Sequence, residues 1–193
     1  MAQSSTQISG QKTFKSAITV TEGCTFTSTS GTNKIAAAST TLAALSVRDL
    51  ITISGTTSNN ATFTIKTVDD NGAFITVEET VTAETSDGST DTVLTYSGFV
   101  TEKFKGDGYY SQADGIHTVA YHVNSTCTGN VKMQGTLATT PTEDDYFDIA
   151  NTTFTTDQST TVSPVNFTGN FVFVRAKFSS QTAGSLTKIL YNN

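Results

Sequence analysis

The chain holds two histidines, and their spacing decides whether they can act together in catalysis. His117 and His122 lie five residues apart in the segment IHTVAYHV, which alternates apolar and polar residues as a β-strand does. Because successive side chains of a strand point to opposite faces, the two imidazoles are expected on opposite sides of a sheet. Serine is abundant, yet the sequence has no G-x-S-x-G motif around a candidate nucleophile. We therefore expect no catalytic residue and no enzymatic activity.

Two turns are rich in carboxylates, whose oxygens suit calcium. One holds Glu143, Asp144 and Asp145 with Asp148 nearby, and the other spans residues 69–71. Neither turn has the D-x-[DN]-x-[DN]-G spacing of an EF-hand loop. We expect solvated turns without a metal or another cofactor, and a calcium site remains the alternative.

Cys24 and Cys127 are the only cysteines, and about a hundred residues separate them. The sequence has no C-x-x-C pair, so neither a zinc site nor a redox motif of that kind is indicated. We expect two buried, unreactive thiols. A disulfide between the two halves of the chain is the alternative.

Five aromatic residues lie where the pattern predicts loops or a chain end rather than the core of a sheet. Tyrosine and phenylalanine are enriched in protein interfaces. These residues therefore form the candidate interface, with the alternative that they cap the cores of their domains: Tyr109, Tyr110, Tyr146, Phe147 and Tyr191.

The elements that must position these residues are short strands, because period-2 alternation dominates the chain. Gly, Asn, Asp and Ser clusters separate the strands, and the segment DDNG at residues 69–72 predicts a tight hairpin between ATFTIKTV and AFITVEE. Residues 36–47 differ, since AAASTTLAALSV favours a short helix or a loop that plugs one end of a small barrel. The other predicted strands are 13–20, 25–29, 50–55, 116–123, 130–137, 163–167, 170–178 and 185–191.

Composition agrees with an ordered β protein and removes several other classes. The 193 residues include 40 Thr and 20 Ser, and only 15% are charged, against roughly 25% in a typical globular chain. Threonine is β-branched and suits the solvated face of a strand. The net charge of −6 with scattered basic residues argues against nucleic-acid binding. We also expect a soluble protein made in the cytoplasm, because no segment resembles a signal peptide or a membrane span.

Strands at this spacing, with no helix long enough for a β-α-β unit, predict an all-β protein. The period-2 alternation of apolar and polar residues becomes weaker between residues 97 and 115, so we place a domain boundary there. We expect an N-terminal small β-barrel or sandwich at 1–100, which would dock to a larger assembly. A linker at 101–114 and a C-terminal antiparallel, jelly-roll-like β-sandwich at 115–193 follow.

Several sequence segments of the second half resemble a β-sandwich domain found in virion proteins of tailed bacteriophages of the marine and cyanophage type. They are GIHTVAYHV (115–123), TGNVKMQGTLATTPTEDDYFDI (128–149) and FTGNFVFVRAKFSSQTAGSLTKILYNN (167–193). The first half is similar to a small phage structural module through the segment at 49–84. In the second-half pattern a Trp often follows the acidic turn, whereas this chain has Tyr146 and Phe147 there and no Trp.

The resemblance implies a non-enzymatic structural or accessory protein of the virion, assembled in the host cytoplasm. A head decoration or a neck or tail attachment is expected, with other virion proteins as partners and a homo-oligomeric state. The alternative is a receptor- or glycan-binding module of a tail fibre, which would bind a host surface glycan. The missing Trp weakens that alternative, because sugar platforms often stack on Trp.

Overall fold

The computed structural model describes residues 5–21, 23–37, 40–85, 91–110 and 115–193. They form two compact units. Unit 1 combines the described residues up to Phe14 with those from Val100 to Asn193, and unit 2 is formed by the described part of Lys15–Phe99.

Strands make up the architecture of both units, which confirms the all-β prediction. Within the described residues the helical segments are three short 3₁₀ turns, namely η1 (Thr40–Ala44), η2 (Asp107–Tyr110) and η3 (Glu143–Asp145). No helix in that part of the chain has the length and apolar character needed to cross a membrane.

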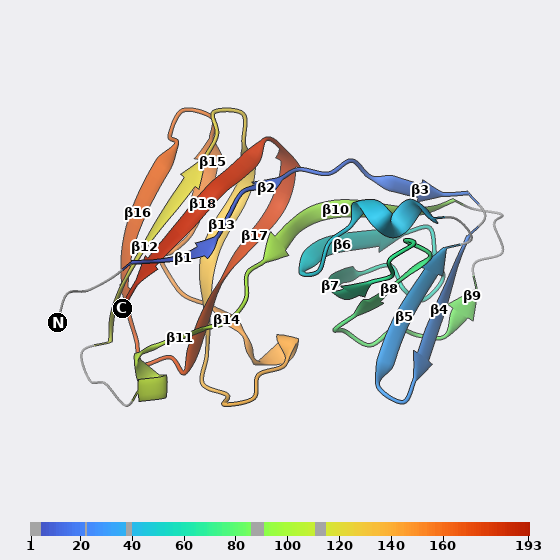
Figure 1. Ribbon diagram of the computed structural model, residues 1–193, viewed down its shortest axis with the longest axis horizontal. Helices are drawn as coiled ribbons and strands as arrows, with labels where there is room; N and C mark the ends of the chain where they lie inside the picture. The colour runs from blue at the N-terminus through green and yellow to red at the C-terminus, as the bar shows by residue number, and fades with distance from the viewer. Residues whose placement is uncertain (1–4, 22, 38–39, 86–90, 111–114) are drawn as a thin grey trace. The chain divides into compact units, whose positions relative to one another are not determined.

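Unit 1 is built from two antiparallel sheets (Figure 1). The first has the strand order β1-β18-β12-β16, with β2 also paired to β18. Its strands are β1 (Thr6–Ser9), β2 (Lys12–Thr13), β12 (Ile116–Val123), β16 (Val162–Thr168) and β18 (Ser185–Asn192). The second sheet has the order β14-β13-β17, with β15 on β13 and β11 on β17. Its strands are β11 (Phe104–Lys105), β13 (Thr128–Thr136), β14 (Phe147–Asp148), β15 (Phe154–Asp157) and β17 (Phe173–Ala183).

Apolar side chains on the inner faces of the two sheets form the core of unit 1, which gives it the character of a β-sandwich. Tyr121 of the first sheet is fully buried, and its ring stacks on Phe154 of the second sheet at a centroid distance of 6.4 Å. The Tyr121 hydroxyl donates a hydrogen bond of 2.9 Å to the carbonyl oxygen of Thr152. This bond satisfies the one polar group of a ring that is otherwise held by apolar packing.

The described part of unit 2 contains eight strands. Seven of them follow the order β10-β6-β7-β8-β5-β4-β9, and β3 pairs with β10. Its strands are β3 (Ile18–Val20), β4 (Cys24–Thr29), β5 (Thr32–Ala37), β6 (Asp49–Ser54), β7 (Thr62–Val68), β8 (Phe74–Val77), β9 (Glu84–Thr85) and β10 (Thr92–Val100, whose last residue belongs to unit 1). Leu42 and Leu45, from the segment predicted as a helix or loop, are buried in its core. The pairings among the described residues do not join β9 to β3, so the barrel form of this unit stays a prediction, as does the jelly-roll form of unit 1.

The hairpin predicted around residues 69–72 is confirmed. β7 and β8 pair antiparallel, and Gly72 has the positive φ of 69° that the turn requires. The Asp69 carboxylate accepts hydrogen bonds from the backbone N–H groups of Asn71 and Ala73, both 3.2 Å long. This carboxylate therefore holds the turn itself, which is the ordinary role of Asp in such positions.

The domain boundaries predicted from the sequence need correction at two places. Strands β1 and β2 pair with β18, so residues before Lys15 belong with the C-terminal half rather than with a domain at 1–100. Part of the predicted linker is also ordered, because β11 pairs with β17 through Phe104 and Lys105. Residues 111–114 of that linker lie outside the described part of the chain.

The individual strand predictions differ in outcome. The strand at 116–123 is confirmed, and β17 has buried residues on both faces, as expected for a central strand. The strand predicted at 13–20 is wrong as one element. Residues 13–20 hold the last residue of β2 and the whole of β3, and the chain passes from unit 1 to unit 2 between them.

Neither cysteine is part of a disulfide and both are buried, as the sequence predicted. Burial raises the pKa of each thiol to about 11, although a hydrogen bond with Thr92 opposes the shift at Cys24. We expect neither thiol to react quickly with a disulfide reagent at pH 8 in the native protein, because only the thiolate is nucleophilic. Both should react at once after denaturation without a reductant. Rapid native labelling, or an absence of free thiols after denaturation, would contradict this assignment.

Candidate functional site

One end of the unit 1 sandwich gathers most of the candidate interface. Strand register brings Ile116 opposite Thr168 in the first sheet and Thr136 opposite Phe173 in the second. Only four residues separate Thr168 from Phe173 in the chain, so both rows lie at the same end of the sandwich. Register also brings Lys105 beside Phe173 and Phe147 beside Gly135, which adds β11 and β14 to this end.

A tyrosine–lysine cluster covers one side of this end. Its members are Lys103, Lys105, Tyr109, Tyr110 and Phe173. The rings of Tyr109 and Tyr110 meet edge to face at 5.2 Å, and Tyr109 lies 5.5 Å from the Phe173 ring. The ammonium of Lys105 lies 4.1 Å from the centre of the Tyr109 ring, and that of Lys103 lies 4.6 Å from the centre of the Phe173 ring. A hydrogen bond to Tyr109 raises the pKa of Lys105. The two tyrosines are about half exposed, so the cluster presents aromatic and cationic groups to solvent.

The acidic turn forms the opposite side of the same end, and an arginine holds it in place. Arg175 is buried on the outer face of β17 and binds Glu143 through two hydrogen bonds of 2.7 Å. Its guanidinium lies 3.6 Å from the centre of the Tyr146 ring, and its Nε donates to the Gln134 side-chain oxygen at 2.9 Å. A planar guanidinium suits this combination of bidentate and stacking contacts. Tyr146 is therefore part of an intramolecular stack rather than a free surface ring.

Several of the carboxylates considered as calcium ligands have partners within the protein. Glu143 binds Arg175, and Asp145 accepts hydrogen bonds from the backbone and side chain of Thr142. The backbone hydrogen bond is the main cause that lowers the pKa of Asp145. Within the described residues no group of three or more His, Cys, Asp or Glu side chains is arranged to hold a metal ion. The geometry thus gives the acidic turn a structural role.

Asp148 lies between two like-charged lysines on the outer face of the second sheet. Lys132 and Lys177 are directly opposite in the register of β13 and β17, an arrangement that is destabilising without a neighbouring anion. Asp148 accepts hydrogen bonds from Lys132 and from the Gln134 amide. Partial burial acts to raise its pKa, but these bonds and the charges of both lysines outweigh burial and lower the pKa below the usual value.

This lowered pKa predicts a pH-dependent contribution to stability. Ionised Asp148 stabilises the folded state above the pKa of the unfolded chain, about 4, and the contribution disappears as the pH falls through the lower folded-state pKa. The wild-type protein should therefore exceed Asp148→Asn in melting temperature at pH 7, and the difference should shrink towards pH 2. Thermal unfolding followed by circular dichroism at several pH values measures it. A difference that stays constant with pH would contradict the prediction.

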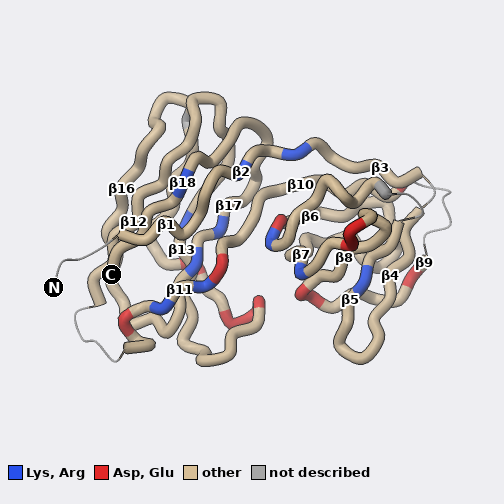
Figure 2. Tube along the Cα trace, in the orientation of Figure 1, with Lys and Arg blue, Asp and Glu red and all other residues tan. Residues whose placement is uncertain are grey.

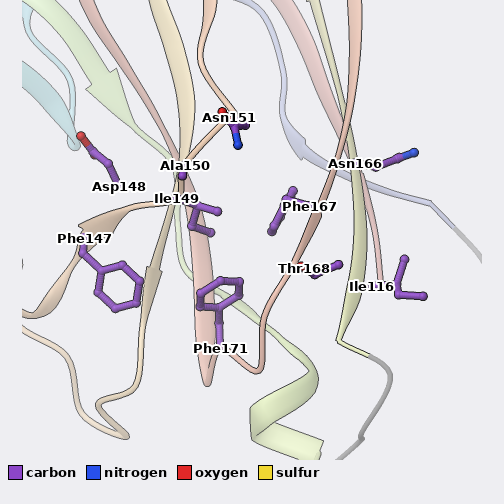
Figure 3. Close-up of a pocket in the computed structure, with 10 residues that line it drawn as sticks. All are labelled: Ile116, Phe147, Asp148, Ile149, Ala150, Asn151, Asn166, Phe167, Thr168 and Phe171. Atoms are coloured by element: carbon purple, nitrogen blue, oxygen red, sulfur yellow. The ribbon is translucent and has the colours of Figure 1, made fainter.

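A cavity of about 500 Å³ opens at this end (Figure 3). The rings of Phe147 and Phe171 line it side by side, 6.0 Å apart between centroids and tilted by 54°, and Phe167 and Ile149 point into the same space. The side chains of Asp148 and Asn166 point away from the cavity. This orientation agrees with their hydrogen bonds, from Lys132 and Gln134 to Asp148 and from Thr118 to Asn166. The cavity is therefore lined mainly by apolar side chains.

His117 lies behind the cavity and is fully buried, whereas His122 on the opposite face is partly exposed, so the prediction of opposite faces is confirmed. The His117 ring stacks on Phe167 at 4.9 Å. Its Nε2 lies 2.9 Å from the Gly169 carbonyl oxygen, which can only accept. Nε2 therefore carries the proton, and Nδ1 accepts a 2.7 Å hydrogen bond from the Tyr191 hydroxyl.

Tyr191 needs correction as a candidate interface residue, because it is 3% exposed. Burial, with a smaller contribution from the negative charge of Asp107, raises the pKa of its hydroxyl. The residue anchors the last strand to the core instead of facing a partner. Tyr191 lies two residues after the buried Ile189 and therefore on the same face of the strand. The period-2 alternation of the sequence thus predicts its burial.

No protein-family model and no curated protein sequence matches the chain.

The structure brings Tyr109, Tyr110 and Phe147 to one end of unit 1, and it adds residues that the sequence did not single out. Ile116 and Leu137 are the most exposed large apolar side chains of the described residues, at 61% and 66%. The only sign of their exposure in the sequence was that each is an apolar residue beside a predicted turn.

Proposed function

We propose that the protein is a non-enzymatic structural or accessory subunit of a phage virion that binds other virion proteins. The observation that carries the proposal is the gathering of exposed apolar residues. Of the seven large apolar side chains found exposed in the described residues, five lie at the same end of the unit 1 sandwich: Tyr109, Tyr110, Ile116, Leu137 and Phe147. Exposed apolar residues grouped around an apolar cavity are typical of a protein-binding surface.

The virion location rests on the resemblance of the segments at 115–123, 128–149 and 167–193. A head decoration or a neck or tail attachment fits a protein that has such a binding surface and no catalytic motif. The exposed apolar end lies on unit 1, so we propose unit 1 as the docking part. This differs from the expectation that residues 1–100 dock.

The glycan-binding alternative has less support from the cavity. A sugar needs several polar groups directed at its hydroxyls, in addition to an aromatic platform. The Asp148 and Asn166 side chains at the cavity rim bond within the protein and point outward. Aromatic and aliphatic side chains of a protein partner match the remaining apolar lining better.

The test is whether the protein is present in virions. Particles purified by density gradient are analysed by mass spectrometry, and an antibody against the purified protein is used for immunogold labelling. We expect the protein in the particle fraction at a regular position on the head, neck or tail. Recovery only from the soluble lysate, with no label on particles, would refute the proposal. Binding of the purified protein to a glycan array would instead favour the tail-fibre alternative.

A further inference from the structure

We propose that a second copy of this chain binds at the exposed end of unit 1, with the tyrosine–lysine cluster of each copy against the acidic turn of the other. The inference rests on the proposed function and names one partner of that binding surface. Closed symmetric pairing of identical subunits is the commonest form of homo-oligomer, and it requires a surface that is complementary to itself.

The open edge of the first sheet is a poor place for such pairing. β16 is the last strand of that sheet in the described pairing order. The hydrogen bonds from Val123 N–H to Thr161 and from Gly169 N–H to Gly115 show that odd-numbered residues of this segment bond towards β12. The backbone N–H and C=O groups of the even-numbered residues 162–168 therefore point to the open edge of the sheet. One of them is Pro164, which lacks an N–H group and protects the edge against an added strand.

The end of the sandwich, in contrast, carries exposed lysines on one side and exposed carboxylates on the other. β11 brings Lys103 and Lys105 to one side of β17, while the acidic turn lies over Arg175 on the side of β13 and β14. Figure 2 shows basic positions along β11 and acidic positions in the segment between β13 and β14. Lys103, Lys105, Asp144 and Asp145 are all exposed. A two-fold axis through this end would place lysines against carboxylates twice.

Apolar residues between the two charged sides supply the area that such a contact buries. Leu137 directly follows β13, and Phe147 and Ile116 lie at the mouth of the cavity. All three are about half exposed or more, and a second copy would remove them from water together. Apolar burial drives association, and complementary charges fix the orientation.

Sedimentation equilibrium of the full chain tests the inference. The wild-type protein should approach twice the mass of 20.4 kDa as its concentration rises, and dissociate with added salt. Lys105→Glu and Asp144→Lys should each weaken self-association at least about tenfold, because each places like charges opposite one another twice. An equimolar mixture of the two variants should associate as well as wild type, since both contacts are then restored. The double variant should recover in the same way.

Two matched controls separate the surface from general effects. Leu137→Ser should weaken association, whereas Val47→Ser, an exposed apolar residue of unit 2, should not. Asp70→Lys in the hairpin turn of unit 2 is the charge control for Asp144→Lys. A monomer at all concentrations, insensitivity to Lys105→Glu or Asp144→Lys, or failure of the mixture would overturn the inference. A monomer that is found in virions would refute only this inference, whereas a dimer that is absent from virions would refute only the proposed function.

Discussion

Arg175→Met is expected to lower the free energy of unfolding of unit 1 by about 3 kcal/mol. The Arg175 side chain is 4% exposed, and its guanidinium is the partner of both Glu143 oxygens and of the Gln134 side chain. Removing it leaves a partly buried carboxylate and a buried amide without these partners, which costs more than the loss of one hydrogen bond. The value lies at the lower end of the range for broken buried pairs because the Glu143 side chain is 22% exposed.

Urea unfolding followed by circular dichroism measures the effect. The two units allow more than one transition. Arg175→Met should shift only one of them, and this should be the transition that the unit 2 variant Lys15→Met leaves unchanged. Lys177→Met is the matched control, two residues further along the same face of β17 and only partly buried, and it should change stability by less than about 1 kcal/mol. A similarly small effect of Arg175→Met would show that the acidic turn does not depend on this arginine.

Lys15→Met is expected to destabilise unit 2 by about 3 kcal/mol, and Asp49→Asn by only about 1 kcal/mol. Lys15 Nζ lies 2.6 Å from an Asp49 oxygen, which also accepts a 2.8 Å hydrogen bond from the Ser46 N–H. The Asp49 side chain is 1% exposed, whereas that of Lys15 is 26% exposed. Removing the lysine leaves a buried, uncompensated charge. Removing the charge of Asp49 leaves an ammonium that reaches water.

The decisive result is which of the two variants loses more free energy of unfolding, since both remove the same ion pair. Unfolding of both proteins is measured at pH 7 under identical conditions. Equal losses, or a larger loss for Asp49→Asn, would mean that the desolvated carboxylate does not dominate the energetics of this pair. The loss should appear in the unit 2 transition and leave the unit 1 transition unchanged.

Local patterns predicted the elements whose partners are close in sequence. The alternation in IHTVAYHV and the turn at residues 69–72 gave β12 and the β7–β8 hairpin, because each depends on neighbouring residues. Four residues of β1 hold too little pattern to show that their partner is β18. Pairing at that distance depends on the whole sandwich, so sequence periodicity could not reveal it.

The candidate site shows the same division. Its exposed members, Tyr109, Tyr110 and Phe147, were predicted because they are large aromatic residues in loop-like segments. Tyr191 was misjudged because its place near the chain end outweighed its strand periodicity. The pairing of Arg175 with Glu143 joins residues 32 apart, and it decides that the acidic turn is structural. Such a contact is visible only after β13 and β17 are aligned.

The pairing of β1 with β18 has a consequence for the order of folding during synthesis. Register joins Thr6 to Tyr191, so the first sheet of unit 1 cannot be completed until the chain as far as Tyr191 has left the ribosome. Unit 2 lies within one continuous segment and has all its residues much earlier. Because domains fold as units during translation, unit 2 is expected to fold first. The earliest strands then remain unpaired until β18 is available, and this distant contact is expected to slow the formation of unit 1.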